Sequence, residues 1–235
     1  LILAIVERMQ ALLSFQNPDS ELSRFNRGVM NGALHPLSIL ALRLARSMTR
    51  ASGGLFNCTV GGRLVEAGAL PRHGDAPSLS HGDAGDIRIR GRIAKLRRPV
   101  LITLDGIAKG LAVDLAARAL RDSGIESGWI NAGGDLLAFG AAAIPVQRRE
   151  LNGTLTPLGL LRNGAIASSA VSRAPSARFP GLIIGIDEVK PDCGVWSVAA
   201  ASAWRADALT KVAALANAAQ RESIIARLGG RLLNP

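Results

Sequence analysis

Apolar residues recur at helical spacing in several parts of the chain. The spacing predicts helices over residues 1–13, from Pro36 to Gly53-Gly54, over residues 108–122, from about Trp204, and over residues 223–228. Proline suits the first turn of a helix, as at Pro36, and glycine suits the position after its end, as at Gly124.

A shorter helix is predicted after the turn signal Asn17-Pro18-Asp19. Asp19 or Ser20 can cap it, because a short side chain that carries oxygen accepts a hydrogen bond from the N–H groups of the first turn. Leu22 and Phe25 are expected to point inward. The polar side chains expected on the other face are Ser23, Arg24 and Asn26.

Alternating and continuous apolar runs predict strands. A hairpin is expected over residues 87–96, and an apolar strand at residues 99–102 leads through a turn into the helix at residues 108–122. Further strands are expected at residues 128–130, 165–171, 181–186 and 196–201, the last of these being the final strand. Residues 55–64 are expected to form a turn, and residues 68–86, rich in Gly, Pro and Ser, a loop.

The length of 235 residues allows a sizeable core in one large domain or in two closely packed ones. Hydrophobic residues make up 48% of the chain, which indicates a globular protein rather than a disordered one. Tyr is absent and aromatic residues are scarce, so Leu, Ala, Val and Ile must fill the core. No repeat and no long linker divides the chain, and we therefore expect residues 1–235 to form a single domain.

The formal net charge of +10 indicates an acidic partner, such as nucleic acid, anionic lipid or a phosphorylated ligand. The basic residues are scattered in short groups, without the interleaved aromatic residues, zinc ligands or RNP motif of nucleic-acid-binding proteins. The pattern therefore argues against nucleic acid and favours a solvated basic surface.

Cys58 and Cys193 have no metal-ligand spacing. A disulfide between them stays open, but two buried free thiols are favoured. No apolar run reaches the length of a membrane span. The chain begins without Met inside a predicted helix, so we expect the natural protein to begin earlier, and any signal peptide or lipid anchor to lie outside these residues.

The turn before the helix at residues 108–122 is a candidate anion site. It holds Asp105, Gly106, Lys109 and Gly110. A junction from strand to helix directs backbone N–H groups and the positive helix end toward a ligand, and a lysine adds a point charge suited to phosphate. Gly106 and Gly110 would let the backbone come close to that ligand. A plain connection in which glycine serves only the turn explains this stretch equally well.

Two other groups have alternative interpretations. The segment Asn131-Ala132-Gly133-Gly134-Asp135 is either a hairpin turn or, beside the first turn, the second wall of a phosphate cleft. The loop at residues 68–86 contains His73, Asp75, His81 and Asp83, but their spacing matches no metal-ligand pattern, which favours a solvated loop.

Asp207, Thr210 and Lys211 share one helix face, because they stand at positions i, i+3 and i+4. A carboxylate and a hydroxyl so placed can offer oxygen ligands to Mg²⁺. A surface ion pair between Asp207 and Lys211, worth about 0.2–0.5 kcal/mol, explains the same spacing and is favoured on spacing alone.

Five segments, taken in order, change the balance between the metal-site and surface-pair interpretations. They are residues 17–26, 56–61, 106–114, 131–135 and 206–210. In sequence and in order they resemble the ApbE family of FAD:protein FMN transferases, and the resemblance covers nearly the whole chain. It implies an α+β fold related to the T-fold, with mixed sheets, packed helices and an FAD cleft between subregions.

The resemblance also implies a reaction. The family breaks the pyrophosphate of FAD, attaches FMN through a phosphoester to a Thr or Ser of a target flavoprotein, and releases AMP, with Mg²⁺ at the pyrophosphate. The partners are then FAD and the acceptor flavoprotein, with membrane contact only through an unseen anchor or a membrane-bound acceptor. The family resemblance implies a periplasmic or membrane-associated location, while a cytoplasmic one stays open.

Motif positions imply the site residues. Asp207 and Lys109 would be catalytic. Gly106 would bind the metal through its carbonyl and Asp207 through its carboxylate, and the pair Thr210 and Lys211 would fill the remaining position. The residues implied to bind FAD are Ser23, Thr59, Thr103, Asp105, Lys109, Asn131, Gly133, Gly134 and Asp135.

The chain departs from the family pattern at several positions. Thr103 stands where the family has Asp, so a carboxylate that contacts flavin is either missing or replaced by Asp105. Lys211 stands where the family has Thr, and Thr210 lies one position earlier. The family's His-bearing strand corresponds to residues 181–187, which contain no His, and its Thr-Ser-Gly segment appears as Ser168-Ser169-Ala170. A lysine ammonium cannot ligate Mg²⁺; it would repel the ion or stand in for it electrostatically. Two functions are thus predicted: the transferase, or a non-catalytic FAD- or nucleotide-binding homologue in which Lys211 and the missing His have abolished transfer.

Overall fold

The computed structural model describes residues 2–30, 32–172, 182–187 and 189–233. The chain divides into two compact units. The helical unit comprises residues 3–108 and 184–189, and the sheet unit comprises residues 1–2, 109–183 and 190–235. The single-domain prediction and the predicted FAD cleft stay predictions.

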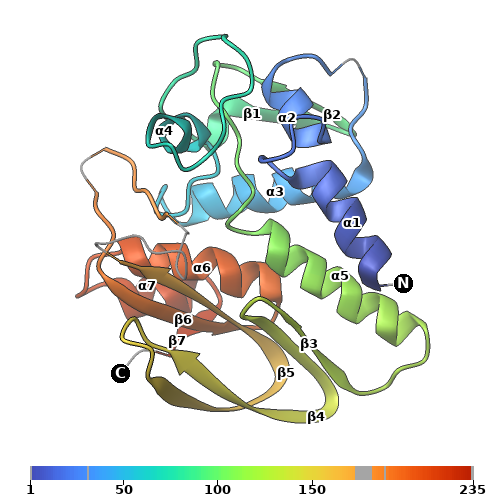
Figure 1. Cartoon of the computed structure of the whole chain (residues 1–235), viewed down its shortest axis with the longest axis vertical. Coiled ribbons are helices and arrows are strands. Elements are labelled where there is room, and N and C mark those ends of the chain that lie inside the picture. Colours follow the sequence, from blue (N-terminus) through green and yellow to red (C-terminus); the bar gives the residue numbers. More distant parts are fainter. Residues whose placement is uncertain (1, 31, 173–181, 188, 234–235) are drawn as a thin grey trace. The chain divides into compact units, whose positions relative to one another are not determined.

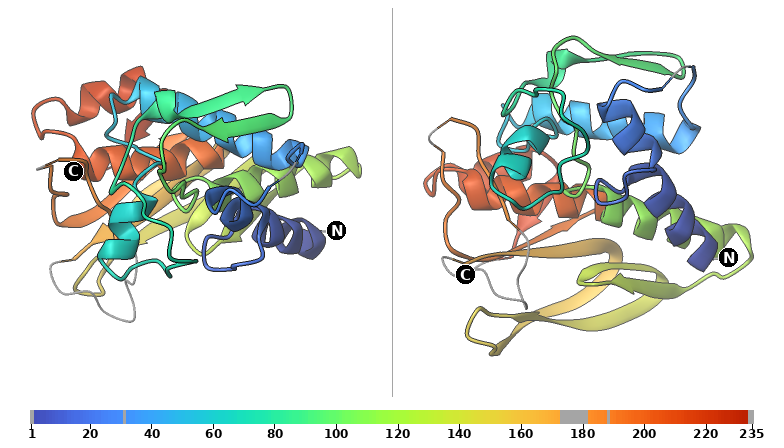
Figure 2. Two further views of the ribbon diagram at one scale, coloured as in Figure 1. Left: turned by 90° about the horizontal axis from the view of Figure 1, so that it is seen from above. Right: turned by 45° about the horizontal axis from the view of Figure 1, so that its top comes forward.

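The helical unit contains four helices and a two-stranded hairpin among its described residues (Figure 1). They are α1 (Ile2–Leu13), α2 (Glu21–Asn26), α3 (Pro36–Ala51), α4 (Gly61–Glu66), β1 (Ile87–Arg90) and β2 (Ile93–Leu96), with a short 3₁₀ turn at Ala84–Asp86. The predicted hairpin over residues 87–96 is therefore confirmed, and Figure 2 shows it as a separate antiparallel pair.

The predicted helix boundaries in this unit are confirmed by their caps. The Ser20 hydroxyl accepts a hydrogen bond from the Ser23 N–H at 3.0 Å and so caps α2. Pro36 lies in the first turn of α3, and Gly53 and Gly54, with φ of 64° and 87°, follow its last turn. One expectation for α2 was wrong: Ser23 is buried rather than on an outer polar face, and its hydroxyl donates to the Phe15 carbonyl at 3.2 Å.

Three other local expectations were wrong. Residues 55–64, expected to be a turn, contain the start of α4. Val100 and Leu101 form isolated bridges instead of a strand. Residues 182–186 contain no strand, and Gly181 lies outside the described residues. Tertiary packing explains the first two: a Cβ at Gly61 would lie 2.6 Å from the Leu101 carbonyl oxygen, so only glycine lets helix and extended chain meet there.

The sheet unit is built on one antiparallel sheet with strand order β3-β4-β5-β6-β7. Its strands are β3 (Gly128–Ala132), β4 (Asp135–Arg149), β5 (Leu155–Val171), β6 (Gly194–Ala200) and β7 (Gly230–Leu232). Figure 2 shows β4 and β5 as a long curved hairpin. The length of β4 was not predicted, since Gly140 and Pro145 weaken its strand pattern, and β7 makes the prediction of a final strand at residues 196–201 wrong.

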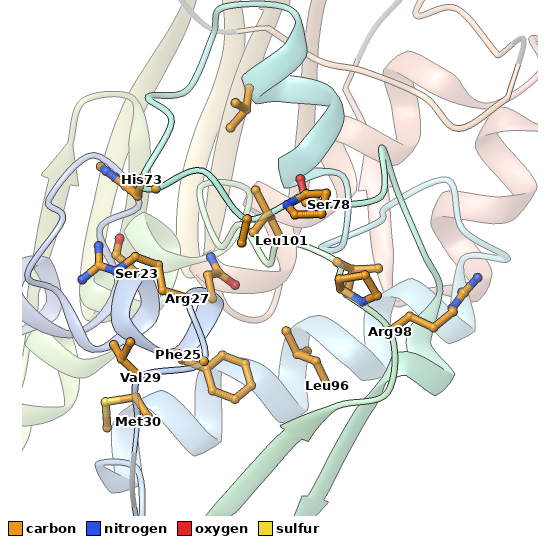
Figure 3. A pocket seen from close by; sticks show the side chains of 18 of the residues that line it. Ser23, Phe25, Arg27, Val29, Met30, His73, Ser78, Leu96, Arg98 and Leu101 are labelled. Carbon is orange, nitrogen blue, oxygen red and sulfur yellow. The ribbon is translucent and has the colours of Figure 1, made fainter.

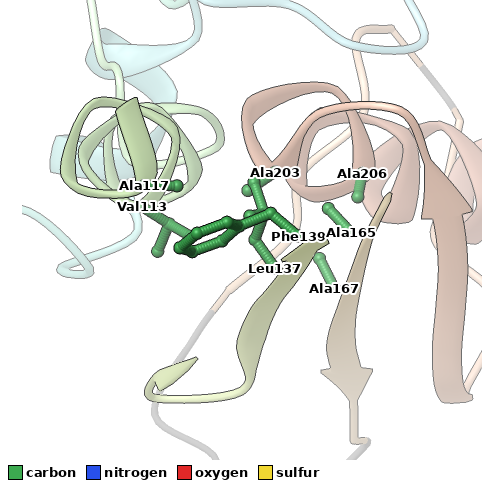
Figure 4. Close-up of a cluster of buried hydrophobic side chains, with 8 residues drawn as sticks. All are labelled: Val113, Ala117, Leu137, Phe139, Ala165, Ala167, Ala203 and Ala206. Carbon is green, nitrogen blue, oxygen red and sulfur yellow. The ribbon is translucent and has the colours of Figure 1, made fainter. Parts of the chain in front are cut away.

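Helices α5 (Ala108–Asp122) and α6 (Ala203–Leu215) pack against this sheet, and α7 (Arg221–Arg227) follows them. Figure 4 shows side chains of α5, α6, β4 and β5 pointing toward one another around Phe139. The other buried members of this cluster are Val113, Ala117, Leu137, Ala165, Ala167, Ala203 and Ala206. Alanine lets the helices approach the sheet closely. Apart from Phe139, the buried members are Leu, Val and Ala, three of the four residue types predicted to fill the core.

Helix α5 also holds the first turn of α6. A Cβ at Gly110 would lie 2.4 Å from the Ala203 carbonyl oxygen, so glycine is required for this approach. The two carboxylate oxygens of Asp114 accept hydrogen bonds from the N–H groups of Ala203 and Trp204, at 2.8 and 2.9 Å. The expectation that Gly110 admits a ligand was therefore wrong, because the backbone that approaches it belongs to α6.

Both cysteines are free thiols, as favoured, but only Cys58 is buried and Cys193 is exposed. Burial raises the pKa of the Cys58 thiol to about 11. None of the helices in the described ranges is both long and apolar enough to cross a membrane.

Candidate functional site

Three of the sequence motifs meet in the sheet unit. Lys109 lies in the first turn of α5, Asp135 begins β4, and Asp207 and Lys211 lie one turn apart on α6. The Gly133-Gly134 turn sets the position of Asp135, because both glycines have positive φ (59° and 98°) and so form a tight hairpin turn. The hairpin interpretation of this segment is thus confirmed, and the Gly134 N–H donates to Asn131 Oδ1 at 3.0 Å.

Two acidic side chains of this group are almost fully buried. Asp135 is 1% exposed and Asp207 2% exposed. Lys109 Nζ lies 3.3 Å from Asp135 Oδ1, and Lys211 Nζ forms an ion pair with Asp207 Oδ1. Within the described part of the chain, Asp135 Oδ2 and Asp207 Oδ2 accept no hydrogen bond. A buried carboxylate oxygen without a donor is costly, so these two atoms indicate a ligand that brings a hydrogen-bond donor, rather than a purely structural pair.

Burial and, to a lesser extent, the nearby charge of Asp207 together raise the pKa of Asp135 to about 7, against the opposing effects of Lys109 and Lys211. The Asp135 carboxyl can therefore gain or lose a proton near neutral pH. Side chains with pKa values displaced in this way are common at catalytic sites.

A chain of hydrogen bonds fixes the ammonium of Lys211. Lys211 Nζ donates to Ser169 Oγ at 3.1 Å, and the Ser169 and Thr210 hydroxyl oxygens are 2.7 Å apart. The Thr210 hydroxyl donates to the Asp207 carbonyl at 2.7 Å. Its single proton is thereby used, so in the hydrogen bond between the two hydroxyl groups Ser169 donates and Thr210 accepts. Thr210 thereby supports Lys211 instead of presenting a free hydroxyl.

The groups around Asp207 do not fit Mg²⁺ well. The resemblance implied Gly106, Asp207 and Thr210 as ligands, but the Thr210 hydroxyl is fully buried and engaged within its own helix turn. Asp207 Oδ1 is already paired with the ammonium of Lys211, a group that cannot ligate a metal. No group of three or more His, Cys, Asp or Glu side chains that could hold a metal occurs among the described residues.

The remaining predicted residues lie in the helical unit, mostly in structural roles. Thr59 is buried, and its hydroxyl donates to Asn57 Oδ1 at 2.7 Å and accepts from the Gly82 N–H at 2.9 Å. The Thr103 N–H donates to the Cys58 carbonyl at 2.9 Å, and Asp105 is exposed, with Gln16 Nε2 3.5 Å from its Oδ2. Gly106 lies half-buried in the turn before α5.

A pocket of about 710 Å³ opens in the helical unit beside α2 (Figure 3). Its lining includes Ser23, Phe25, Met30, His73 and Leu101. The volume lies in the range of small-molecule sites, which are mostly apolar with a few polar groups. Of the sequence-predicted site residues, only Ser23 lines it.

Sequence reasoning missed two features of these regions. Ser169 was noted only as a counterpart of a family segment, although its hydroxyl binds Lys211. The pocket was also missed, since Val29 was not singled out and His73 was considered only as a metal ligand in the loop at residues 68–86. His73 Nε2 lies 2.6 Å from the Phe15 carbonyl oxygen, and its ring stacks on Phe15, so tertiary contacts rather than spacing define its role.

A comparison with family profiles gives one match, to the ApbE family, over residues 1–232. The chain belongs to the ApbE family. A search of curated protein sequences gave no match. The ApbE assignment is therefore based on the family profile, and solved structures add the fold.

Several solved ApbE structures share this fold. The flavinyl transferase ApbE of Pseudomonas stutzeri, in its apo form, matches with a TM-score of 0.78 and 19% identity over 96% of this chain and 77% of its own. The flavin transferase ApbE of Vibrio cholerae matches with a TM-score of 0.76 and 20% identity over 95% and 79%. The ApbE protein of Thermotoga maritima matches with a TM-score of 0.78 and 20% identity over 98% and 83%. The predicted α+β ApbE-like fold is thus confirmed.

Proposed function

We propose that this protein is an FAD:protein FMN transferase, which moves FMN from FAD to the hydroxyl of a Thr or Ser in a target flavoprotein and releases AMP. One observation carries the proposal: Lys109, Asp135 and Asp207, from three separate family motifs, meet in one charged cluster whose two carboxyl groups are buried. The Pseudomonas and Vibrio relatives are flavin transferases, which supports the same reaction class.

The reaction requires one phosphorus–oxygen bond to form and another to break. The acceptor oxygen bonds to the phosphorus of the FMN half, the bond to the AMP phosphate breaks, and its electron pair leaves with AMP. The ammonium groups of Lys109 and Lys211 would stabilise the negative charge that develops on the phosphate oxygens. The acceptor hydroxyl must lose its proton, and the pKa of Asp135, at about 7, suits a general base at neutral pH.

The pocket of the helical unit supports the binding of FAD. Phe25, Val29 and Met30 offer apolar surface to an aromatic ring system, and Ser23 and Arg27 offer polar contacts at its lining (Figure 3). The resemblance implies Mg²⁺ dependence, but the groups around Asp207 do not fit the ion, since Lys211 pairs with the carboxylate and the Thr210 hydroxyl is engaged in its own helix.

The test is to incubate the purified protein with FAD, with and without Mg²⁺, and to measure AMP by chromatography. Co-expression with a flavoprotein that offers an exposed Thr or Ser adds a second readout, covalent flavin fluorescence in a denaturing gel. AMP together with covalent flavin is the expected result. If FAD binds but neither product forms under any condition, the transferase proposal fails.

That negative result would favour a second candidate, a non-catalytic FAD- or nucleotide-binding homologue. The ion pair between Lys211 and Asp207 is the observation that favours it. A second observation is that residues 181–187, which correspond to the His-bearing strand of the family, contain no His. Gly181 of this segment lies outside the described residues.

A further inference from the structure

The charges of the cluster in the sheet unit balance without a metal. Two buried carboxyl groups, Asp135 and Asp207, each have one ammonium partner, Lys109 and Lys211. In a site of this kind a divalent ion would add two positive charges next to two ammonium groups, and repulsion would disfavour it.

The position of Lys211 is also well defined. Its side chain is 21% exposed, against 45% for Lys109, and two of its N–H donors are used by Asp207 and Ser169. Ser169 in turn bonds to Thr210, and Thr210 to the Asp207 carbonyl. A lysine on a solvated surface pair does not need three neighbouring groups to orient it, so the surface-pair interpretation of the spacing does not explain this network.

We propose that the ammonium of Lys211 occupies the cation position beside Asp207, and that this protein binds the pyrophosphate of its substrate without a divalent metal. The proposal rests on the proposed function for the identity of the substrate. The third N–H of Lys211 would donate to a phosphate oxygen, the kind of contact that a lysine makes as a point charge. Asp207 and Ser169 act as positioning residues for that ammonium.

The first experiment needs no substrate. Mn²⁺ is titrated into the purified wild-type protein and into Lys211→Thr, and free Mn²⁺ is followed by electron paramagnetic resonance. The wild type is expected to show no specific site, whereas Lys211→Thr leaves Asp207 without its ammonium and gains one Mn²⁺ site. Lys190→Thr, at an exposed lysine of the same unit, is the matched control and should behave as the wild type.

The second experiment measures FAD affinity by flavin fluorescence, in EDTA and in Mg²⁺. For the wild type and Lys190→Thr, the two affinities should agree within about twofold, since a difference of that size is well under 1 kcal/mol. For Lys211→Thr, affinity in EDTA should fall about tenfold and recover in Mg²⁺, as expected when one charge-assisted hydrogen bond is lost and a metal replaces it.

A specific Mn²⁺ site in the wild type that disappears in Asp207→Asn would overturn the proposal, and so would FAD binding by the wild type that requires Mg²⁺. Both outcomes are measured on the wild type, so they stay decisive if Lys211→Thr does not fold. A failure of the proposed function looks different: FAD binds without release of AMP, or does not bind at all, while the Mn²⁺ titration still decides the role of Lys211.

Discussion

Two buried aspartates, one in each unit, have opposite pKa shifts. Asp86 of the helical unit is 3% exposed and Asp135 of the sheet unit 1% exposed. The Arg98 guanidinium donates to both oxygens of Asp86, at 2.7 and 2.5 Å, and lowers the pKa of that carboxyl. Asp135 has only the more distant ammonium of Lys109 and the added repulsion of Asp207, and burial raises its pKa to about 7.

The difference in hydrogen-bond partners distinguishes a structural carboxylate from one that is available for chemistry. A carboxylate held by a bidentate guanidinium and the Asp83 N–H has its hydrogen-bonding needs met and stabilises its own fold. A buried carboxyl with an oxygen that accepts no hydrogen bond does not stabilise the fold in this way. Its presence is explained by binding of a ligand or by proton transfer. The same residue type at similar burial therefore serves different purposes, and the partner decides which.

The largest expected effect is on the reaction. Asp135→Asn should lower AMP release from FAD by about 10²-fold, because a general base is lost. Its free energy of unfolding should not fall, since a poorly paired buried charge is removed. AMP release and urea unfolding measure the two quantities.

Asp86→Asn is the matched control for that change. It should lower the urea midpoint, because Arg98 loses its partner, and leave AMP release of the folded protein within about twofold of wild type. If Asp86→Asn abolished AMP release while Asp135→Asn did not, the comparison between the two aspartates would be wrong.

A smaller effect is expected from filling the pocket of the helical unit. Val29 is 54% exposed and lines the pocket, so Val29→Trp can fold while its indole occupies the opening. FAD should bind about tenfold more weakly, which is about 1.4 kcal/mol, as measured by flavin fluorescence. Leu3→Trp, at a site 77% exposed on α1, provides the control, and equal affinities in the two variants would remove the pocket from the FAD site.

The smallest effect is a pH dependence of stability. The pKa of Asp86 is lowered in the folded state, so its contribution to stability is complete above the unfolded value of about 3.9 and is lost as the pH falls through the folded value. Arg98→Ala should therefore be less stable than wild type at pH 6, and the difference should close in acid. Urea unfolding across this range measures it.

Arg118→Ala is the control for the pH experiment. Arg118 is 77% exposed and lies 3.6 Å from Asp122 across one turn of α5, so its loss should have little effect at any pH. A stability difference for Arg98→Ala that persists unchanged into acid would show that packing, rather than the Asp86 charge, accounts for the effect.

Local signals in the sequence were enough for much of the secondary structure. Ser20, Pro36 and the Gly53-Gly54 pair mark helix ends, as expected from their capping chemistry. The Gly133-Gly134 turn follows from the ability of glycine to adopt positive φ. These features depend only on residues within one turn of each other, so no tertiary information is needed to place them.

Elements that depend on distant partners were missed. Helix α4 begins with Gly61 and Gly62 because other backbone segments pass within contact distance, which no local pattern records. β7 is three residues long and exists because β6 offers it an edge. A strand was expected at residues 181–186, but the described part of it, residues 182–186, contains none. A short apolar run can also line a core without forming a strand, and here Ile184 and Ile186 pack against a cluster that includes Phe15 and Val60.

The sequence by itself determined the family of this protein, through five ordered motifs, together with the charged residues that its site contains. Only the tertiary structure decided what each of them does. Spacing placed Lys211 one helical turn from Asp207. The hydrogen bond from Lys211 to Ser169, however, joins it to a strand about forty residues away in the sequence. Burial and pairing depend on the whole fold, and they distinguish a surface lysine from an ammonium held in a buried charged cluster.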